Sequence, residues 1–337
     1  MKEVALDRLV RALTWRRMHN LALAVSSYAT SVATGRPHVW GLPAILMVEP
    51  TNRCNLRCPE CHTGSGQINR PPARLPLDLF RRLMDEVGEQ LVYLLLFNQG
   101  EPYLHPDFLG FVRYAKRLGI YVTTSTNGHF FDDPTVVADT VTSGLDTVVV
   151  SLDGADRQTY EFYRRGGSFD RVTRGVRNLV TTRERLLSST PRVFVQFLVL
   201  RHNEHQLPSI RLLASELGAD RLLVKTAQVA TAAEAEQFLP RQERYRRYRI
   251  QQGHLVPKGT RRLPCRRPWL SAVVNSDGRV SPCCFDKDGR YAMGNVAEAP
   301  LAAIWSSAAY NSFRERILNG EEIDICTNCT EGRRVFV

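Results

Sequence analysis

The sequence has no long apolar run, no internal repeat and fewer acidic than basic residues. No segment approaches the roughly 18 consecutive apolar residues of a membrane-spanning helix, which excludes a protein built from such helices. Without repeats or low-complexity tracts, and with 43% hydrophobic residues, the chain has the composition of an ordinary globular protein. Its 34 acidic residues against 45 lysines and arginines leave a net charge of +11. This charge suits an anionic partner and, equally, a basic solvated surface.

We expect no signal peptide either. Basic residues near the N-terminus precede an apolar run, Leu21 to Val25, but this run is too short and lies too far into the chain. Residues 6–25 carry apolar side chains at every third or fourth position, which predicts an amphipathic helix. Its expected role is packing on the main domain, with docking on a membrane surface as the alternative. We therefore expect a cytoplasmic protein, in which eight cysteines indicate metal binding rather than disulfides.

From residue 44 onwards, short apolar runs alternate with helical patterns. Strands are predicted at 44–50, 91–97, 121–126, 147–153, 193–200 and 221–226. The intervening helical patterns occupy 77–90, 105–119, 133–144, 169–187 and 207–218. Buried, β-branched runs separated by helices are typical of right-handed βαβ units around a parallel sheet. Six units are too few for a closed eight-unit barrel, so the predicted α/β fold is a partial (β/α)6 barrel.

The alternation stops near residue 230, where a charged segment follows. Residues 231–261 predict a linking helix whose Arg/Tyr run is a solvated face rather than a nucleic-acid surface. Beyond it, 271–284 predicts a hairpin and 300–318 a helix. The expected parts are an N-terminal helical extension, the partial barrel, the linking helix and a small cysteine-rich domain, at 1–43, 44–230, 231–261 and 262–337.

Three cysteines gather within eight positions just after the first predicted strand: Cys54, Cys58 and Cys61. Active sites of βα barrels lie at this end of the strands. Four protein ligands would close a structural zinc site, and His62 could supply the fourth. Three thiolates can instead hold three irons of a [4Fe–4S] cluster and leave the fourth iron open to another ligand.

The C-x3-C-x2-C motif after the first strand of a βα domain resembles the radical S-adenosylmethionine (AdoMet) superfamily. In that family the open iron binds the amino and carboxylate groups of AdoMet. An electron from the cluster cleaves AdoMet to methionine and a 5′-deoxyadenosyl radical, which abstracts a substrate hydrogen. The resemblance covers roughly residues 44–230 and implies a [4Fe–4S] cluster on the three cysteines. One departure is Glu60, where the family usually has an aromatic or other apolar residue.

Further matches to this family lie where the next strands are predicted to end. The sequence NQGEP at 98–102 resembles the family's Gly-Gly-Glu-Pro element, which receives the AdoMet amino group. STNG at 125–128 and SLDG at 151–154 suit ribose contacts, although Asn-Gly and Asp-Gly are also common in ordinary turns. In YRRGGSFDRV the resemblance implies an arginine that pairs with the AdoMet carboxylate. The implied AdoMet contacts are Gly100, Glu101, Pro102, Ser125, Asn127, Ser151, Asp153 and Arg164, the last chosen over Arg165.

A second set of cysteines lies near the C-terminus. Without Cys284 the set has the spacing C-x17-C-x42-C-x2-C, which suits a zinc ion or an iron–sulfur cluster equally. This pattern, with MGNVAEAPLAAIWSS before the last pair, resembles the C-terminal extension called SPASM and its shortened form, twitch. The number of cysteines then implies one auxiliary [4Fe–4S] cluster, as in twitch enzymes of the 2-deoxy-scyllo-inosamine dehydrogenase type. Its implied ligands are Cys265, Cys283, Cys326 and Cys329.

Cys284 remains outside this ligand set. It could pack beside the cluster, replace Cys283 as a ligand, or return a hydrogen atom to a substrate radical, as in radical AdoMet epimerases. In this last role we predict Cys284 to be a catalytic residue. The three possibilities stay open at this point.

The resemblance implies an oxidoreductase that uses AdoMet and two [4Fe–4S] clusters. The auxiliary cluster would remove an electron from the substrate radical, for instance when an alcohol carbon of a sugar or cyclitol becomes a ketone. The alternatives are an epimerase and the maturation of a ribosomally made peptide. Peptide maturases often carry an N-terminal peptide-binding domain longer than the roughly 43 residues that precede the first strand here. A flavodoxin- or ferredoxin-type protein would supply the electron.

Overall fold

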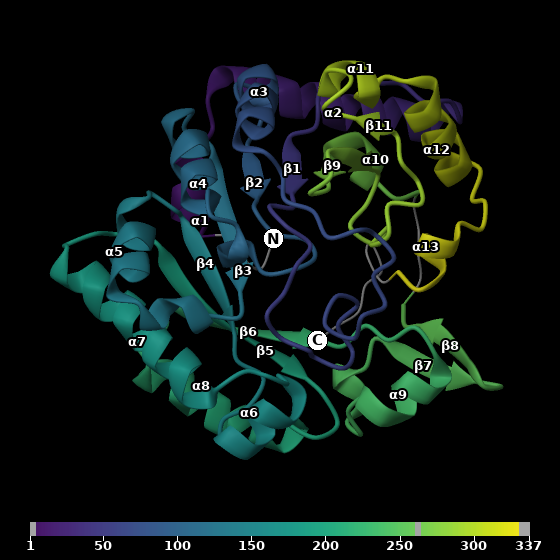
Figure 1. The fold of residues 1–337 in the computed structure, drawn as a ribbon. Helices are drawn as coiled ribbons and strands as arrows, with labels where there is room; N and C mark the ends of the chain where they lie inside the picture. The colour runs from purple at the N-terminus through teal and green to yellow at the C-terminus, as the bar shows by residue number, and fades with distance from the viewer. Residues whose placement is uncertain (1–4, 260–263, 330–337) are drawn as a thin grey trace.

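The computed structural model describes residues 5–259 and 264–329, so parts of the predicted first, third and fourth segments lie outside the described residues. A nine-stranded sheet in the order β11-β10-β9-β1-β2-β3-β4-β5-β6 forms its centre. Helices cover the outer side of the curved sheet, and loops fill the space that it encloses (Figure 1). The predicted partial (β/α)6 barrel is confirmed, since six consecutive strands pair in parallel in chain order.

The six barrel strands are short and mostly buried. The sequence predicted all of them, although β1, β2 and β4 are shorter than expected. In β4 every side chain is buried, because helices cover one face of the strand and the barrel interior covers the other. The strands are β1 (Ile45–Val48), β2 (Tyr93–Leu95), β3 (Tyr121–Thr126), β4 (Thr147–Ser151), β5 (Arg192–Val199) and β6 (Arg221–Thr226).

Each outer helix turns one apolar stripe towards the sheet. In α3 the buried side chains recur at three- and four-residue spacing, and Phe80 stacks on Phe111 of α4 with 4.4 Å between ring centroids. The predicted outer helices are α3 (Leu77–Val87), α4 (Phe108–Arg117), α5 (Pro134–Thr142), α7 (Phe169–Arg185) and α8 (Leu207–Glu216). The sequence missed α6 (Arg157–Tyr163) and the short 3-10 helices η1 (Pro102–Leu104), η2 (His129–Asp132) and η3 (Glu204–Gln206).

The C-terminal part continues the barrel sheet instead of forming a separate layer. β9 (Ser271–Val274) pairs in parallel with β1, and β10 (Arg279–Ser281) and β11 (Gly294–Asn295) follow antiparallel. The predicted hairpin is thus confirmed. The predicted helix over 300–318 is two helices, because Ser307 caps the second one. The helices of this part are α10 (Arg267–Leu270), α11 (Leu301–Trp305), α12 (Ala308–Leu318) and α13 (Asp324–Thr327).

The predicted linking helix over 231–261 is wrong beyond its first two turns. The helix α9 (Ala232–Phe238) ends just before Pro240, which disfavours helical backbone at the residue before it. A short 3-10 helix, η4 (Glu243–Tyr245), follows, and then a hairpin of β7 (Tyr248–Gln251) and β8 (His254–Pro257). Gln252 and Gly253 both have positive φ, as a tight hairpin turn requires.

The predicted N-terminal helix is also divided. α1 (Leu6–Arg11) is separated from α2 (Trp15–Thr34), because the Thr14 side chain caps the second helix. Among the described residues, no helix is long and apolar enough to cross a bilayer. In Figure 1, α2 lies along the top of the molecule.

Arg17 fixes the position of α2. Its buried guanidinium donates to four backbone carbonyls, those of Ala12, Gly88, Leu118 and Gly119, at 2.6–3.0 Å. Gly88 and Leu118 are the C-caps of α3 and α4, where a positive charge also meets the negative end of each helix dipole. Since these helices end just before β2 and β3 begin, α2 lies at the N-terminal ends of the barrel strands.

Arg17→Met should lower the free energy of unfolding by about 2–4 kcal/mol, because buried carbonyls lose a charged donor. Anaerobic urea unfolding followed by circular dichroism measures this loss. Arg16→Met is the matched control: Arg16 is exposed and pairs with exposed Glu89, so its loss should change stability by no more than about 0.5 kcal/mol. Equal effects of the two substitutions would contradict the anchoring role of Arg17.

Candidate active site at the C-terminal ends of the barrel strands

The loop after β1 carries the first cysteine set, and its three thiols pack against one apolar cluster that contains Leu56 and Tyr163. The Leu56 N–H donates to Cys54 Sγ at 3.4 Å, and the Cys61 N–H donates to the Cys58 carbonyl at 3.2 Å. Burial, and to a smaller degree the neighbouring thiols, raise the pKa of Cys54 to about 12. The structure therefore brings Cys54, Cys58 and Cys61 together at one apolar cluster.

This donor set fits an iron–sulfur cluster with one open iron. Each thiolate of such a cluster binds a different iron, so the three sulfurs need not converge on one point. Among residues 5–259 and 264–329, no three His, Cys, Asp or Glu side chains converge on a single metal position. His62, the fourth ligand in the zinc alternative, contacts a carboxylate, with 2.9 Å between its Nε2 and Asp288 Oδ1. The side chain of His62 is thus engaged with the C-terminal part.

The turn after β2 lies directly against the cysteine loop. Gly100 has φ +75°, and a Cβ atom at this position would lie 2.4 Å from the Thr51 carbonyl oxygen and 2.6 Å from that of Arg53. Only glycine fits such an approach. The Glu101 N–H donates to the same Arg53 carbonyl at 2.7 Å, and Pro102 then begins η1. The turn and the loop therefore hold each other in place.

The Glu101 carboxylate is buried and connects the ends of β2 and β3. It accepts hydrogen bonds from Thr126 Oγ1 and the Asn127 N–H, both at 2.7 Å, and from the Tyr103 N–H at 3.2 Å. Burial raises its pKa to about 7 despite these bonds. Asn127 in turn donates from Nδ2 to Asn55 Oδ1 at 2.8 Å, which reaches the cysteine loop.

Asp153, after β4, holds Arg164 against the first cysteine set. Its Oδ2 accepts from Arg164 Nε at 2.6 Å, while Oδ1 accepts from the Leu198 N–H at 2.7 Å. Arg164 Nη1 lies 3.9 Å from Cys58 Sγ. The Arg165 side chain is exposed. Of the two arginines, the structure therefore places Arg164 at the strand ends.

Five of the predicted AdoMet contacts thus surround the cysteine loop: Gly100, Glu101, Asn127, Asp153 and Arg164. The other three lie on the same edge of the barrel. Ser125 is half-buried on β3, Ser151 ends β4, and Pro102 is buried at the start of η1.

The second cysteine set occupies adjoining segments of the C-terminal part. Contact with Cys284 and burial raise the pKa of Cys283 well above its usual value. Arg267, two residues after Cys265, has its Nη1 3.9 Å from Cys284 Sγ. The segments of Cys265 and Cys283 therefore meet beside Cys284.

Cys326 and Cys329 lie in and after α13, where the Cys329 N–H donates to the Cys326 carbonyl at 3.2 Å. The Tyr291 hydroxyl donates to Asp324 Oδ1 at 2.6 Å and connects α13 to the loop that follows Cys283. These contacts gather the four predicted ligands on neighbouring loops. Four thiols fit a fully ligated cluster or, by donor chemistry alone, a zinc ion.

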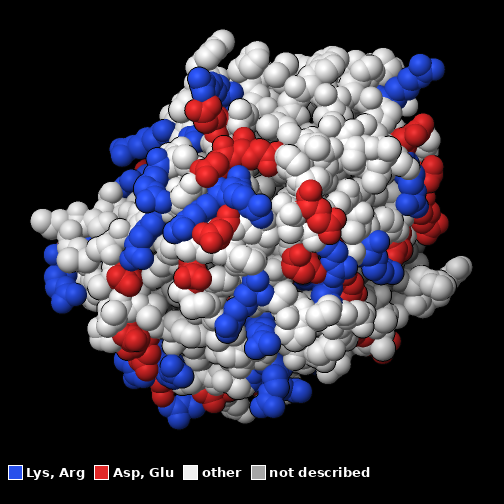
Figure 2. Space-filling view, turned by 45° about the horizontal axis from the view of Figure 1, so that its top comes forward, with Lys and Arg blue, Asp and Glu red and all other residues white. Residues whose placement is uncertain are grey.

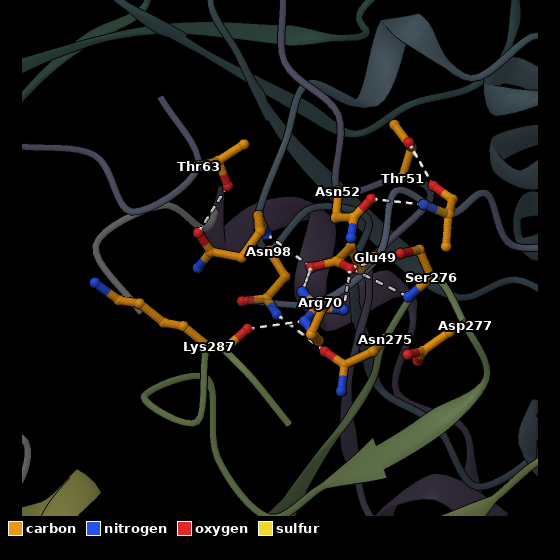
Figure 3. A network of polar contacts seen from close by, with 12 residues as sticks. Glu49, Thr51, Asn52, Thr63, Arg70, Asn98, Asn275, Ser276, Asp277 and Lys287 are labelled. Atoms are coloured by element: carbon orange, nitrogen blue, oxygen red, sulfur yellow. Dashed lines mark hydrogen bonds and ion pairs between the residues drawn. The ribbon is translucent and has the colours of Figure 1, made fainter. Parts of the chain in front are cut away.

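A buried ion pair at the centre of this region was missed by the sequence analysis. Glu49, at the end of β1, accepts two hydrogen bonds from Arg70, each of 2.8 Å, and neither side chain is exposed by more than 1%. Glu49 also accepts from the Gln99 N–H at 3.1 Å and from Ser276 Oγ at 2.8 Å (Figure 3). The available signal was an acidic residue directly after the apolar run ILMV.

The same arginine joins the cysteine loop to the C-terminal part. Arg70 Nε donates to the Lys287 carbonyl at 2.9 Å, and the neighbouring Asn69 N–H donates to Asp288 Oδ1 at 3.0 Å. Figure 3 shows Arg70 between Glu49 and the backbone at Lys287. The cysteine loop, the turn after β2 and the hairpin of β9 and β10 are therefore connected through one charged pair.

Comparison with known families gives two matches. The model described as "Radical SAM superfamily" matches residues 48–190, and the model SPASM, described as "Iron-sulfur cluster-binding domain", matches residues 265–330. The first range contains the first cysteine set and all the predicted AdoMet contacts. The second contains the remaining five cysteines.

Curated relatives match most of the chain. The tungsten-containing aldehyde ferredoxin oxidoreductase cofactor-modifying protein of Pyrococcus furiosus is 28% identical over 318 residues, which are 85% of this chain and 86% of that protein. The PqqA peptide cyclase of Gluconobacter oxydans is 29% identical over 293 residues, which are 81% of this chain and 79% of that protein.

Two solved structures share the fold. SuiB of Streptococcus suis, bound to S-adenosylmethionine, has a TM-score of 0.62 at 16% identity and covers 86% of this chain and 71% of its own. BtrN in complex with AdoMet and 2-DOIA has a TM-score of 0.53 at 18% identity. The match covers 86% of this chain and 94% of the BtrN chain. At these identities the likeness establishes the fold alone.

Arg70→Met should lower the free energy of unfolding by about 3–5 kcal/mol, because it leaves the Glu49 carboxylate buried without its counter-charge. Denaturant unfolding of the anaerobic protein measures this. Adding Glu49→Gln should recover part of the loss, since it removes the stranded charge. Arg279→Met is the control, because the Arg279–Asp277 pair is partly exposed and should cost no more than about 1 kcal/mol. A fully stable Arg70→Met protein would show that the pair is not a structural support.

Proposed function

Because the chain belongs to the radical SAM superfamily and carries a C-terminal SPASM domain, we propose that it oxidises a substrate carbon by hydrogen-atom abstraction. Its cofactors are AdoMet and two [4Fe–4S] clusters. When bound, AdoMet and the first cluster supply a 5′-deoxyadenosyl radical. The observation that carries the proposal is the meeting of three thiols, the Gly100 turn and Arg164 at one edge of the barrel.

Each residue at this edge has a distinct role in the proposal. Cys54, Cys58 and Cys61 would hold the first cluster. Gly100 approaches the cysteine loop closely, and backbone groups of its turn would receive the AdoMet amino group. Arg164, oriented by its ion pair with Asp153, would bind the AdoMet carboxylate.

Glu101 has two tasks in this arrangement. It orients the ends of β2 and β3 through its three hydrogen bonds, and in the proposal it would also accept one from the AdoMet ammonium. A carboxylate accepts about four hydrogen bonds, so one more donor can be accommodated.

The auxiliary cluster would be held by Cys265, Cys283, Cys326 and Cys329. With every iron ligated by a thiolate, such a cluster has no open position for a substrate, which leaves electron transfer as its role. The electron lost by the substrate radical would leave through these four thiolates. A flavodoxin- or ferredoxin-type donor would reduce the first cluster.

Two classes of substrate are candidates for this oxidation. The first is an alcohol carbon of a sugar or cyclitol, which would become a ketone; the known structure of BtrN with 2-DOIA has this kind of fold. The second is a ribosomally made peptide. This candidate is favoured by the relative named PqqA peptide cyclase and by SuiB, which has been crystallised with the precursor peptide SuiA. Both candidates use hydrogen abstraction followed by loss of an electron.

The role of Cys284 decides between oxidation and epimerisation of the substrate. Its contacts include Cys283 and Arg267, both in the C-terminal part. These neighbours support a packing or ligand role more than that of a hydrogen donor to a substrate radical. We therefore keep oxidation as the proposed reaction and epimerisation as its alternative.

The triple variant Cys54/Cys58/Cys61→Ala should lose all reductive cleavage of AdoMet. After anaerobic reconstitution it should retain about four irons, whereas the parent should hold about eight. Iron and sulfide analysis and chromatographic detection of 5′-deoxyadenosine provide the measurements. Production of 5′-deoxyadenosine by the variant would remove these cysteines from the site, and one zinc per chain in the parent would refute the auxiliary cluster.

Cys284→Ala should keep about four auxiliary irons and still give a product oxidised by two electrons, seen as a mass loss of about 2 Da. The matched Cys283→Ala variant should lose the auxiliary cluster and this oxidation. The reaction is run in deuterated water and followed by mass spectrometry. Incorporation of one solvent deuterium into a redox-neutral product, abolished by Cys284→Ala, would establish epimerisation instead.

A further inference from the structure

The buried face of the helix α2 is mainly polar, whereas several of its apolar side chains are exposed. The residues that it buries are Arg17, Asn20, Ala24, Ser27 and Ser31, four of which are polar. A helix on the surface of a globular protein normally has the opposite arrangement, with an apolar stripe towards the core. The buried face of α2 is held in place largely by hydrogen bonds, together with the ring contact of Tyr28 with Trp269.

These hydrogen bonds fix how α2 is rotated about its axis. Asn20 accepts from the Leu42 N–H at 2.8 Å and donates to the Leu42 carbonyl at 3.0 Å. Ser31 Oγ accepts from the His38 N–H at 2.8 Å and from Trp269 Nε1 at 3.0 Å. Together with the four bonds of Arg17, they hold the opposite face of the helix towards solvent.

That opposite face is an apolar stripe about four turns long. Trp15 is 75% exposed, and Met18 and Val25 are 46% and 48% exposed. Ala22 and Ala29, also exposed, complete the spacing of three and four residues that places all five on one side of the helix. A contiguous exposed apolar surface of this kind marks an interaction site.

A second indole extends the apolar surface beside the helix. Trp40 is 52% exposed, and with Trp15 it lines a hollow of about 360 Å³ between α2 and the loops at residues 40–42 and 89–90. Tryptophan is the side chain most typical of the boundary between water and lipid. We name the stripe and Trp40 together the α2 surface.

The chain segment that forms the α2 surface carries charges of one sign. From residue 8 to residue 48 the sequence has five arginines and no aspartate or glutamate. Of these arginines, Arg11, Arg16 and Arg36 are exposed. The one acidic side chain at the hollow, Glu89, pairs with Arg16. In Figure 2, which brings the top of Figure 1 forward, the upper part of the surface carries few charged side chains of either sign.

We propose that the α2 surface docks the enzyme on an anionic lipid membrane. The helix would lie in the plane of the interface, with Trp15, Met18 and Val25 inserted among the acyl chains. The arginines would face lipid phosphates. Because α2 covers the N-terminal ends of the barrel strands, the opposite edge, with the candidate active site, would stay directed towards water.

The experiment uses the full chain with both clusters and sedimentation with lipid vesicles under anaerobic conditions. Vesicles of phosphatidylcholine with 30% phosphatidylglycerol should bind the protein at least tenfold more tightly than vesicles of phosphatidylcholine alone. Trp15→Ser/Met18→Ser/Val25→Ser should lower binding to anionic vesicles by at least tenfold, because it removes most of the inserted apolar area. Arg11→Gln and Arg36→Gln should each weaken it by about fivefold.

A matched control replaces three exposed apolar residues elsewhere, Leu187, Leu212 and Ile250, with serine, and should bind like the parent. Both triple variants should keep the parent's melting temperature and its formation of 5′-deoxyadenosine without vesicles, so that a loss of binding is not a loss of folding. Equal binding to neutral and anionic vesicles, or no binding, would overturn the proposal. So would a concentration-dependent dimer in light scattering that the α2 triple variant abolishes, since it would assign this surface to a second copy of the chain.

Discussion

The arrangement of the active-site edge depends on one buried ion pair, Glu49 with Arg70. A carboxylate and a guanidinium without water are costly unless their remaining hydrogen-bonding positions are occupied. Here the Gln99 N–H and Ser276 occupy those of Glu49, and the Lys287 carbonyl accepts from Arg70. The partners come from the end of β1, the turn after β2 and the C-terminal hairpin. The segments that would carry the two clusters are therefore positioned by the same charges. A shift of one segment would leave a buried polar group of another segment without its hydrogen-bond partner.

The elements that could be predicted from the sequence are those whose cause is local. Most barrel strands contain a short apolar run, and the turns after β2, β3 and β4 carry glycine, so the partial barrel and the edge with the Cys54 loop follow from short stretches of chain. The rest depends on pairing between distant residues. The network of Glu49 requires β9 to lie beside β1, which no local pattern encodes. The hairpin at 248–257 has charged, exposed positions that resemble a helix face, and only its turn at Gly253 indicates a reversal of the chain.

Buried charged groups have different partners at the two edges of the barrel. At the C-terminal ends of the strands, charged groups are buried and paired, as Asp153 is with Arg164 beside Cys58. Such pairs keep side chains in one orientation, which suits a site that must orient a cofactor. At the N-terminal ends, Arg17 binds backbone carbonyls instead of an acid, and Arg16 pairs with Glu89 at the surface. The polarity of the parallel strands thus separates the candidate active site from the α2 surface.

The parallel pairing of β1 with β9 has a consequence for synthesis of the chain. β1 is made early, yet Ile45 pairs with Ser271, which leaves the ribosome only after the whole barrel. Until then one edge of β1 has unpaired backbone groups, next to the loop that carries the first three thiols. A contact so distant in sequence closes slowly. Iron and sulfide could therefore reach this loop in the nascent barrel while the edge of β1 is still unpaired. The last third of the chain would then cover the loop.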